Sequence, residues 1–144
     1  MLVDMKKNYY IIVLLSLSVL VSCSKKYTTR PQLEIKSINT TTLNARDSVK
    51  IVFILRDREG DVSNSPLYIE RKKRDCNPSQ YEFKNLPSFS TTKDFKGDLT
   101  FTYQYNQVST GCIMPGDTCI LRFVLRDNAG NISDTVNTEN IFIH

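Results

Sequence analysis

Histidine and tryptophan are almost missing from this sequence, which has no tryptophan and a single histidine, His144, at its last position. Histidine is the commonest catalytic base and a principal zinc ligand, so one terminal histidine gives little means to build either kind of site. The motifs Gly-x-Ser-x-Gly and His-Glu-x-x-His are also absent. We therefore predict that the protein is not an enzyme and holds no zinc ion.

A strong excess of one charge is lacking as well. The chain has 19 lysines and arginines against 15 aspartates and glutamates, a formal net charge of +4. Nucleic-acid-binding proteins gather a larger basic charge on one face, so we exclude nucleic acid as a partner. The one basic run, residues 71–74, is flanked by Glu70 and Asp75. We interpret it as the solvated end of a strand rather than as a contact with lipid headgroups or glycan.

Long hydrophobic runs are missing too, except near the start of the chain. Lys6 and Lys7 precede an uncharged stretch over residues 9–21, which is shorter than the roughly 20 residues that a membrane-spanning helix needs. A short apolar stretch after basic residues is typical of a secretory signal peptide. Residues 20–23 then read Leu-Val-Ser-Cys and resemble the bacterial lipobox.

That resemblance implies cleavage before Cys23 and attachment of lipid to the Cys23 sulfur. Several acyl chains form a stable anchor, since burial of each methylene contributes about 0.8 kcal/mol. We predict a lipoprotein signal peptide over residues 1–22, a lipidated cysteine and tether over 23–31, and one folded domain over 32–144. Apart from this covalent lipid we expect no cofactor.

Lipidation of Cys23 would leave three cysteines, Cys76, Cys112 and Cys119. The bacterial envelope permits disulfides, but three thiols leave one without a partner in the same chain. Cys112 and Cys119 flank a Met-Pro-Gly-Asp turn, so we expect a disulfide between them first. Closing so short a loop would stabilise the fold by about 2–3 kcal/mol. A bridge from Cys76 to either of them, or no bridge, is left open.

The folded domain shows the alternation of apolar and polar residues that is typical of half-buried strands. Gly, Pro, Asn and Asp separate the segments, and helical periodicity does not extend beyond a turn. About seven such strands in one domain predict an all-β chain with an immunoglobulin-like or fibronectin-III-like antiparallel sandwich, and a small barrel is the alternative. The expected strands are 33–38, 48–56, 65–73, 80–85, 98–106, 118–126 and 132–143, and residues 40–47 are expected to form a polar turn.

One stretch of the domain occurs twice. Residues 53–63 and 123–133 are identical at 6 of 11 positions, and each is an alternating strand that runs through Arg-Asp into a turn with glycine. In a sandwich of this type these two strands face each other across the core, so Phe53 and Phe123 should lie near its middle. The two turns should then be neighbours at the end of the domain where the tether enters.

The acidic residues of these turns are candidate calcium ligands, because Ca²⁺ takes roughly six to eight oxygen ligands. The candidates are Asp57, Glu59, Asp61 and Asp127. We favour turn chemistry instead, in which aspartate accepts hydrogen bonds from amides further along and Gly60 and Gly130 supply positive φ. The second copy keeps Asp127 and Gly130 but replaces the other charges, so the two copies share the turn rather than the ligands.

Tyr103 and Tyr105 fall on one face of the expected strand 98–106, together with Phe101. A row of tyrosines can stack on sugar rings, but such a row is more often a half-buried sheet surface. We favour the half-buried surface.

Three blocks of the chain resemble a group of small Bacteroidota lipoproteins of unknown function. They are the Asp-x-x-Gly-Asp turn at 57–61, the Leu-Pro segment at 86–87 and the block at 122–133. The resemblance implies an immunoglobulin-like fold in the cell envelope and brings no activity with it. We place the lipid anchor in the outer membrane. Residues 24–26 lack the acidic cluster that surface-exposed lipoproteins of this kind often carry, which favours the periplasmic side, and the face stays open.

These observations predict a membrane-tethered immunoglobulin-like module that binds another envelope component, protein or glycan, through its loop end. A carbohydrate-binding or adhesion component at the cell surface is the first alternative. A calcium-stabilised structural spacer is the second.

Lipidation gives the first testable prediction. Cells that express the full chain and are fed a palmitate analogue should label the protein, because the acyl chains attach at Cys23. The Cys23→Ala variant should carry no label and should be released from membranes by washing. A labelled Cys23→Ala variant would contradict the predicted anchor.

Overall fold

The computed structural model describes residues 28–73 and 79–144, in which strands predominate and the only helix is one turn long. The prediction of an all-β chain is confirmed for these residues. The expected signal peptide and the lipidated Cys23 lie outside the described residues. The described part of the chain contains no helix long and apolar enough to cross a bilayer.

The elements are β1 (Gln32–Ile38), β2 (Thr42–Leu43), β3 (Ser48–Asp57), β4 (Pro66–Lys72), β5 (Gln80–Asn85), β6 (Phe95–Gln104), α2 (Tyr105–Val108), β7 (Thr118–Leu125), β8 (Val136–Asn137) and β9 (Ile141–Ile143).

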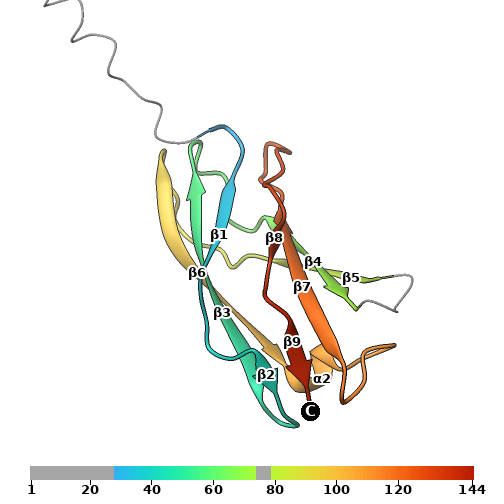
Figure 1. The fold of residues 1–144 in the computed structure, drawn as a ribbon. Helices are drawn as coiled ribbons and strands as arrows, with labels where there is room; N and C mark the ends of the chain where they lie inside the picture. The colour runs from blue at the N-terminus through green and yellow to red at the C-terminus, as the bar shows by residue number, and fades with distance from the viewer. Residues whose placement is uncertain (1–27, 74–78) are drawn as a thin grey trace, which may run out of the picture.

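The strands form two open sheets that lie against each other (Figure 1). The smaller sheet has the order β1-β3-β6, and both of its pairings are antiparallel. The larger sheet has the order β2-β9-β7-β4-β5, with β8 also paired to β7. Its pairings are antiparallel except for the short parallel contact of β2 with β9. Because both sheets are open, the small-barrel alternative is wrong.

Most expected strands are present, and the differences occur where the alternation is interrupted. The expected strand 98–106 ends at Gln104, because the chain turns into α2 and the Tyr105 amide bonds the Asp47 carbonyl. The expected strand 132–143 is broken into an isolated bridge at Ile132, then β8 and β9. The expected turn over 40–47 contains β2, which is too short to show any alternation in sequence.

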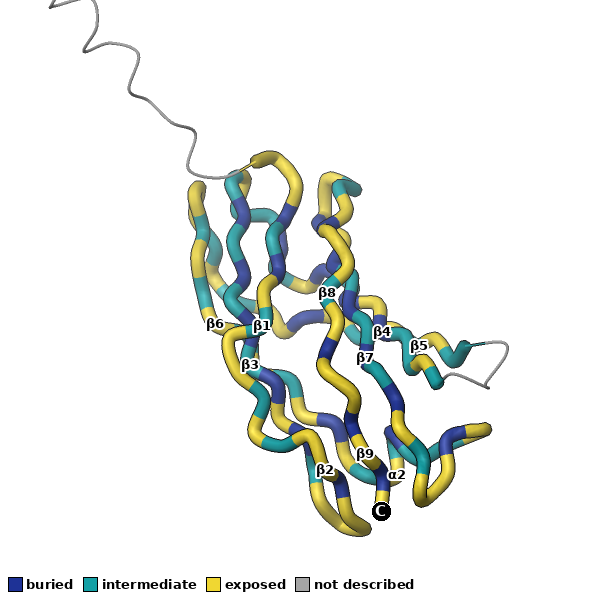
Figure 2. Tube along the Cα trace, in the orientation of Figure 1, coloured by how far each residue is buried: buried dark blue, intermediate teal, exposed yellow. Residues whose placement is uncertain are grey.

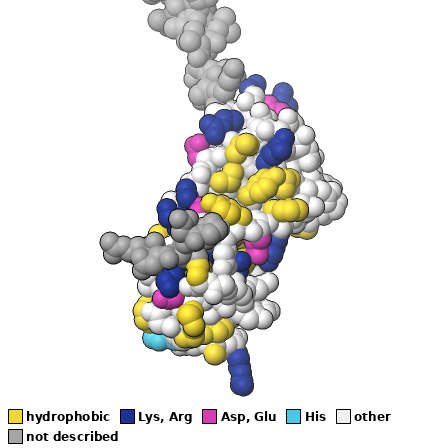
Figure 3. Space-filling model, turned by 90° about the vertical axis from the view of Figure 1, so that its right-hand side faces the viewer, with side chains coloured by type: hydrophobic (Ala, Val, Ile, Leu, Met, Phe, Trp, Pro, Cys, Tyr) yellow, Lys and Arg dark blue, Asp and Glu magenta, His cyan; other side chains and the backbone are white. Residues whose placement is uncertain are grey.

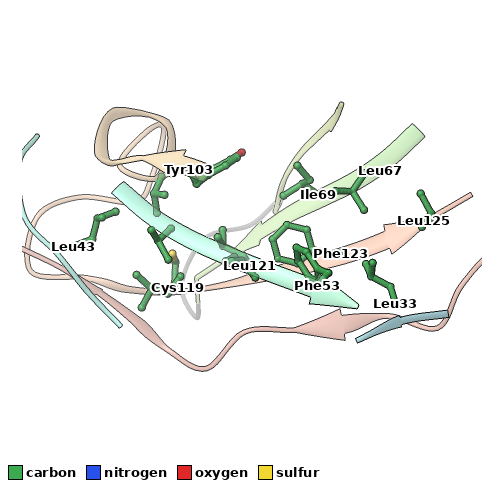
Figure 4. Close-up of a cluster of buried hydrophobic side chains, with 14 of the residues drawn as sticks. Leu33, Leu43, Phe53, Leu67, Ile69, Tyr103, Cys119, Leu121, Phe123 and Leu125 are labelled. Carbon is green, nitrogen blue, oxygen red and sulfur yellow. The ribbon is translucent and has the colours of Figure 1, made fainter. Parts of the chain in front are cut away.

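The core lies between the two sheets, where the apolar faces of β3 and β7 meet (Figures 2 and 4). Phe53 and Phe123 are fully buried, and their ring centroids lie 4.9 Å apart at an interplanar angle of 68°. This edge-to-face arrangement is a favourable geometry for aromatic pairs. The prediction that these two residues lie in the core opposite each other is confirmed. Each strand buries every second residue, namely Val49, Ile51, Phe53 and Leu55 on β3 and Cys119, Leu121, Phe123 and Leu125 on β7.

Candidate functional site

The turns that follow β3 and β7 lie together at the end of the domain where the chain enters β1 (Figure 1). Asp57 is the last residue of β3, and Asp127 comes just after β7. Each of these two residues and Asp61 offers a carboxylate oxygen, and the three oxygens lie within 4.8 Å of one another. The prediction that the two turns are neighbours is therefore confirmed. At the same end, Arg30 donates to the Ile132 carbonyl, which ties the entering chain to the second turn.

Each turn is organised by its leading aspartate. Asp57 Oδ2 accepts hydrogen bonds from the amides of Gly60, at 2.6 Å, and Asp61, at 2.9 Å. In the second copy, Asp127 Oδ1 accepts from the Asn131 amide at 2.7 Å, and the Gly130 amide donates to the Asp127 carbonyl. Both glycines have positive φ, 71° and 93°. The turn interpretation of the repeated motif is confirmed by these bonds.

The two turns are also bonded to each other, chiefly through Asp61. Asp61 Oδ2 accepts from the Ala129 amide at 2.8 Å, and the Asp61 carbonyl accepts from the Asn128 amide at 3.2 Å. The Asn128 side chain adds a bond from its Nδ2 to the Ser63 carbonyl at 2.9 Å. The first turn is thus fastened directly to the second, and through it β3 is fastened to β7.

Three of the four candidate calcium ligands meet at this point. Asp57 and Asp127 are 0% and 3% exposed, and Asp61 is partly buried. Glu59 is exposed and does not join the group, so its inclusion among the ligands is wrong. The turn bends after Arg58 so that Glu59 faces solvent, which spacing along an extended loop did not foresee.

The acidic group is short of compensating donors and cations. Asp57 Oδ1 and Asp61 Oδ1 are buried and have no hydrogen-bond partner. Among the described residues, no ion pair involves Asp57, Asp61 or Asp127. A buried carboxylate that lacks a partner is destabilising. The turns therefore leave an electrostatic deficit that a cation or a proton would offset.

The pKa of Asp57 reflects this deficit. Burial raises the pKa of Asp57, the amide bonds from Asp61 and Gly60 oppose the rise, and the Asp61 carboxylate adds to it. Because the pKa is higher in the folded state than in the unfolded state, the contribution of Asp57 to stability is full below its unfolded pKa. That contribution is lost as the pH rises through the raised pKa, so at neutral pH the ionised group weakens the fold.

A second candidate surface lies on the outer face of the larger sheet, which Figure 3 views from the side of β5. Tyr68 on β4 is 42% exposed, and Tyr81 and Phe83 on β5 are 71% and 64% exposed. The rings of Tyr68 and Phe83 lie 6.2 Å apart between centroids. We call these three side chains, with the half-buried Val124 of β7 beside them, the aromatic face.

Charged groups border the aromatic face. Arg122 and Glu70 form an ion pair at 2.6 Å, and the Tyr81 hydroxyl donates to Glu70 at 3.0 Å. Burial acts to raise the pKa of Glu70, but hydrogen bonds from Ser79 and Tyr81 and the charge of Arg122 hold that pKa below its ordinary value. The aromatic rings thus stand next to an ionised carboxylate and a guanidinium that are held in place.

The tyrosines singled out in the sequence are not the exposed ones. Tyr103 is fully buried, and its hydroxyl bonds Glu82, while Tyr105 lies on α2. Burial raises the pKa of Tyr103 well above its ordinary value, and the Glu82 carboxylate raises it further. The exposed aromatic residues come instead from β4 and β5, where Tyr68 alternates with the buried Leu67 and Ile69.

The basic run at residues 71–74 is not simply the solvated end of a strand, because two of its side chains bond to other parts of the domain. Arg71 donates to the Gln107 carbonyl and, at 2.7 Å, to the Thr110 hydroxyl. Lys73 pairs with Asp117 at 2.6 Å. These bonds hold the segment between α2 and β7 against the end of β4, so two of the four basic residues are already engaged; Arg74 lies outside the described residues.

The expected Cys112–Cys119 disulfide is wrong. Cys119 is a free thiol buried in the core, and burial raises its pKa to about 11. Cys112 is exposed in the loop and is disulfide-bonded. Cys119 points inward because it alternates in phase with Leu121 and Phe123 on β7, which carries it away from the loop surface. Cys76 lies outside the described residues, and its pairing stays a prediction.

Comparison with known proteins does not place the chain in a family. No family model matches it, and no curated protein matches it in sequence. Among solved structures, the sporulation control protein Spo0M from Bacillus subtilis aligns with a TM-score of 0.49 and 11% identity over 81% of this chain, which spans 50% of that one. A superoxide reductase (neelaredoxin) from Ignicoccus hospitalis aligns with a TM-score of 0.45 and 10% identity, over 80% of each chain. Likeness at this level says nothing of function.

The glycines of the two turns, Gly60 and Gly130, should differ in how much stability is lost when each is replaced by alanine. A Cβ at Gly60 would lie 2.2 Å from the Thr92 carbonyl oxygen, whereas at Gly130 the nearest atom is 3.6 Å away on the Arg126 side chain. Both positions carry the strain of positive φ, but only Gly60→Ala adds a clash with backbone. In urea unfolding, Gly130→Ala should lower stability by about 1 kcal/mol and Gly60→Ala by about 1–3 kcal/mol more. Equal losses would contradict the described packing of the first turn.

Proposed function

We propose that the chain is a lipid-anchored protein of the bacterial envelope, held in the outer membrane, whose immunoglobulin-like domain is a non-enzymatic binding module. The fold assignment is supported by strand order. The smaller sheet joins the first, second and fifth of the expected strands, and the larger one joins the third, fourth, sixth and last. This division of strands matches the immunoglobulin-like arrangement. The envelope location rests on the lipobox at residues 20–23.

The observation that carries the binding proposal is the aromatic face. Monomeric proteins seldom leave several large aromatic side chains exposed side by side, and patches of this kind mark contact surfaces. Tyrosine and phenylalanine also dominate the energetics of interfaces, because each buries a large area at low entropic cost. Here Tyr81 and Phe83 are the two most exposed large hydrophobic residues in the described part of the chain.

The aromatic face replaces the loop end as the proposed contact region. At the loop end, Ile132 is the one large hydrophobic side chain that is exposed among the described residues. The turns there are occupied by bonds to one another. The aromatic face also includes two side chains of β5, the edge strand of the larger sheet, so a partner could extend its contact along that edge.

Glycan binding is a second candidate, favoured by the combination of rings and held charges. Sugar rings stack on aromatic faces, and their hydroxyl groups bond to carboxylates and guanidinium groups. Tyr68 and Phe83 supply the rings, and the Glu70–Arg122 pair supplies the polar groups beside them. The exposed aromatic residues of β4 and β5 thus support the carbohydrate alternative better than Tyr103 and Tyr105 did.

Photo-crosslinking in cells tests this proposal. A photoreactive amino acid is placed at Phe83, on the aromatic face, or at Met114, which is 62% exposed against 64% for Phe83 but lies in the loop before β7. With the anchor intact, ultraviolet light should produce an adduct at position 83 and none at position 114. An adduct of one discrete mass that protease removes would identify a protein partner, and a heterogeneous adduct that periodate degrades would identify a glycan.

The comparison of the two positions decides the outcome. No adduct at position 83, or equal adducts at 83 and 114, would contradict the assignment of the aromatic face as the contact surface.

A further inference from the structure

The acidic group between the two turns has the properties of a cation site. The strongest of these is the pair of buried oxygens, Asp57 Oδ1 and Asp61 Oδ1, that no donor in the described residues satisfies. The second oxygen of each carboxylate accepts backbone hydrogen bonds: Asp57 Oδ2 accepts from two amides, and Asp61 Oδ2 accepts from the Ala129 amide. The carboxylates of Asp57 and Asp61 are thus each oriented by backbone hydrogen bonds to one oxygen, while the other oxygen has no hydrogen-bond partner.

The second copy of the motif shows what is missing from the first. In that copy, Asn131 donates its amide group to Asp127 Oδ2 at 2.9 Å, so the leading aspartate is satisfied within its own turn. Asp61 occupies the equivalent position in the first copy. A carboxylate has no hydrogen to donate at neutral pH. Replacing the asparagine by an aspartate therefore removes a donor and adds a negative charge at the same place.

We propose that Asp57, Asp61 and Asp127 bind a calcium ion that joins the two turns. The three carboxylate oxygens lie within 4.8 Å of one another. Ca²⁺ contacts oxygens at roughly 2.3–2.6 Å, so one ion can touch oxygens up to about 5 Å apart. Mg²⁺ requires shorter contacts, at about 2.1 Å, in nearly ideal octahedral geometry. Oxygens separated by up to 4.8 Å can all be reached by one calcium ion, whose coordination geometry is flexible, with water completing its coordination.

The position of the ion gives it a structural effect. Asp57 ends β3 in the smaller sheet, and Asp127 follows β7 in the larger sheet. A calcium ion there would link the two sheets at the end of the domain where the chain enters β1. It would also remove the mutual repulsion of three carboxylates that have no ion pair. Calcium would therefore stiffen the domain next to its anchor, whatever partner the aromatic face binds.

Calcium titration of the full chain in detergent tests the site. We expect one Ca²⁺ per chain by calorimetry, with a Kd below about 1 mM, the range of extracellular calcium modules. Millimolar Ca²⁺ should raise the unfolding temperature measured in EDTA by several degrees, since a ligand that binds only the folded state stabilises it. Mg²⁺ at the same concentration should raise it far less.

Two pairs of variants make the test specific. Asp61→Asn and Asp57→Asn should weaken calcium binding at least tenfold and abolish the temperature shift. Asp61→Asn should unfold in EDTA at or above the temperature of the wild-type chain, because it restores the donor found in the second copy. The controls are Glu59→Gln, in the same loop, and Asp134→Asn, whose side chain is 93% exposed at the same end; both should keep the full shift.

Three results would overturn the proposal. They are the absence of a shift at millimolar Ca²⁺, an equal response to Mg²⁺ and Ca²⁺, and a shift that Asp61→Asn retains as fully as Glu59→Gln. If Asp57→Asn does not fold, Asp61→Asn alone decides the matter, since it keeps every backbone bond of its turn.

Discussion

The edge-to-face contact of Phe53 with Phe123 determines where the two sheets meet, and the geometry of the loop end depends on it. In each copy of the repeat, the aspartate lies four residues beyond the phenylalanine, a distance of about 13 Å along a strand. Because both strands run toward the same end, equal spacing from one shared contact brings Asp57 and Asp127 to the same height. The repetition in sequence thus becomes a meeting of two turns in space.

One difference between the two copies of the repeat, Asp61 in place of Asn131, determines how the carboxylates at the loop end are bonded. Asn131 satisfies Asp127 inside the second turn, whereas Asp61 leaves Asp57 with an unused oxygen and reaches across to the Ala129 amide instead. The aspartate at position 61, where the second copy has asparagine, thus leaves the first turn with one bond fewer of its own but joins it to the second turn. Glu59, the other charge peculiar to the first copy, is exposed and takes no part. The proposed calcium site at this end therefore depends on Asp61.

Alternation along the strands predicted which face of each strand is buried. It did not predict which elements pack on the other face or which side chains bond between strands. It placed Phe53 and Phe123 correctly, and it could also have shown that Cys119, in phase with Leu121, points into the core. It could not show the exposed aromatic face, because Tyr68 stays uncovered only if no other element packs on that side. Nor could it show that Tyr103, which is buried in the core, bonds through its hydroxyl to Glu82 of β5, because β5 belongs to the other sheet.

The two turns form one joined unit and not two independent loops. Hydrogen exchange of their amides measures this directly, since exchange slows where an amide is bonded and its surroundings do not open locally. The amides of Gly60, Asp61, Ala129 and Asn131 should be protected to a similar degree, and the Asp61→Ala variant should expose Ala129 while it leaves Asn131 protected. Rapid exchange at Ala129 in the wild-type chain, beside slow exchange at Asn131, would contradict the claim.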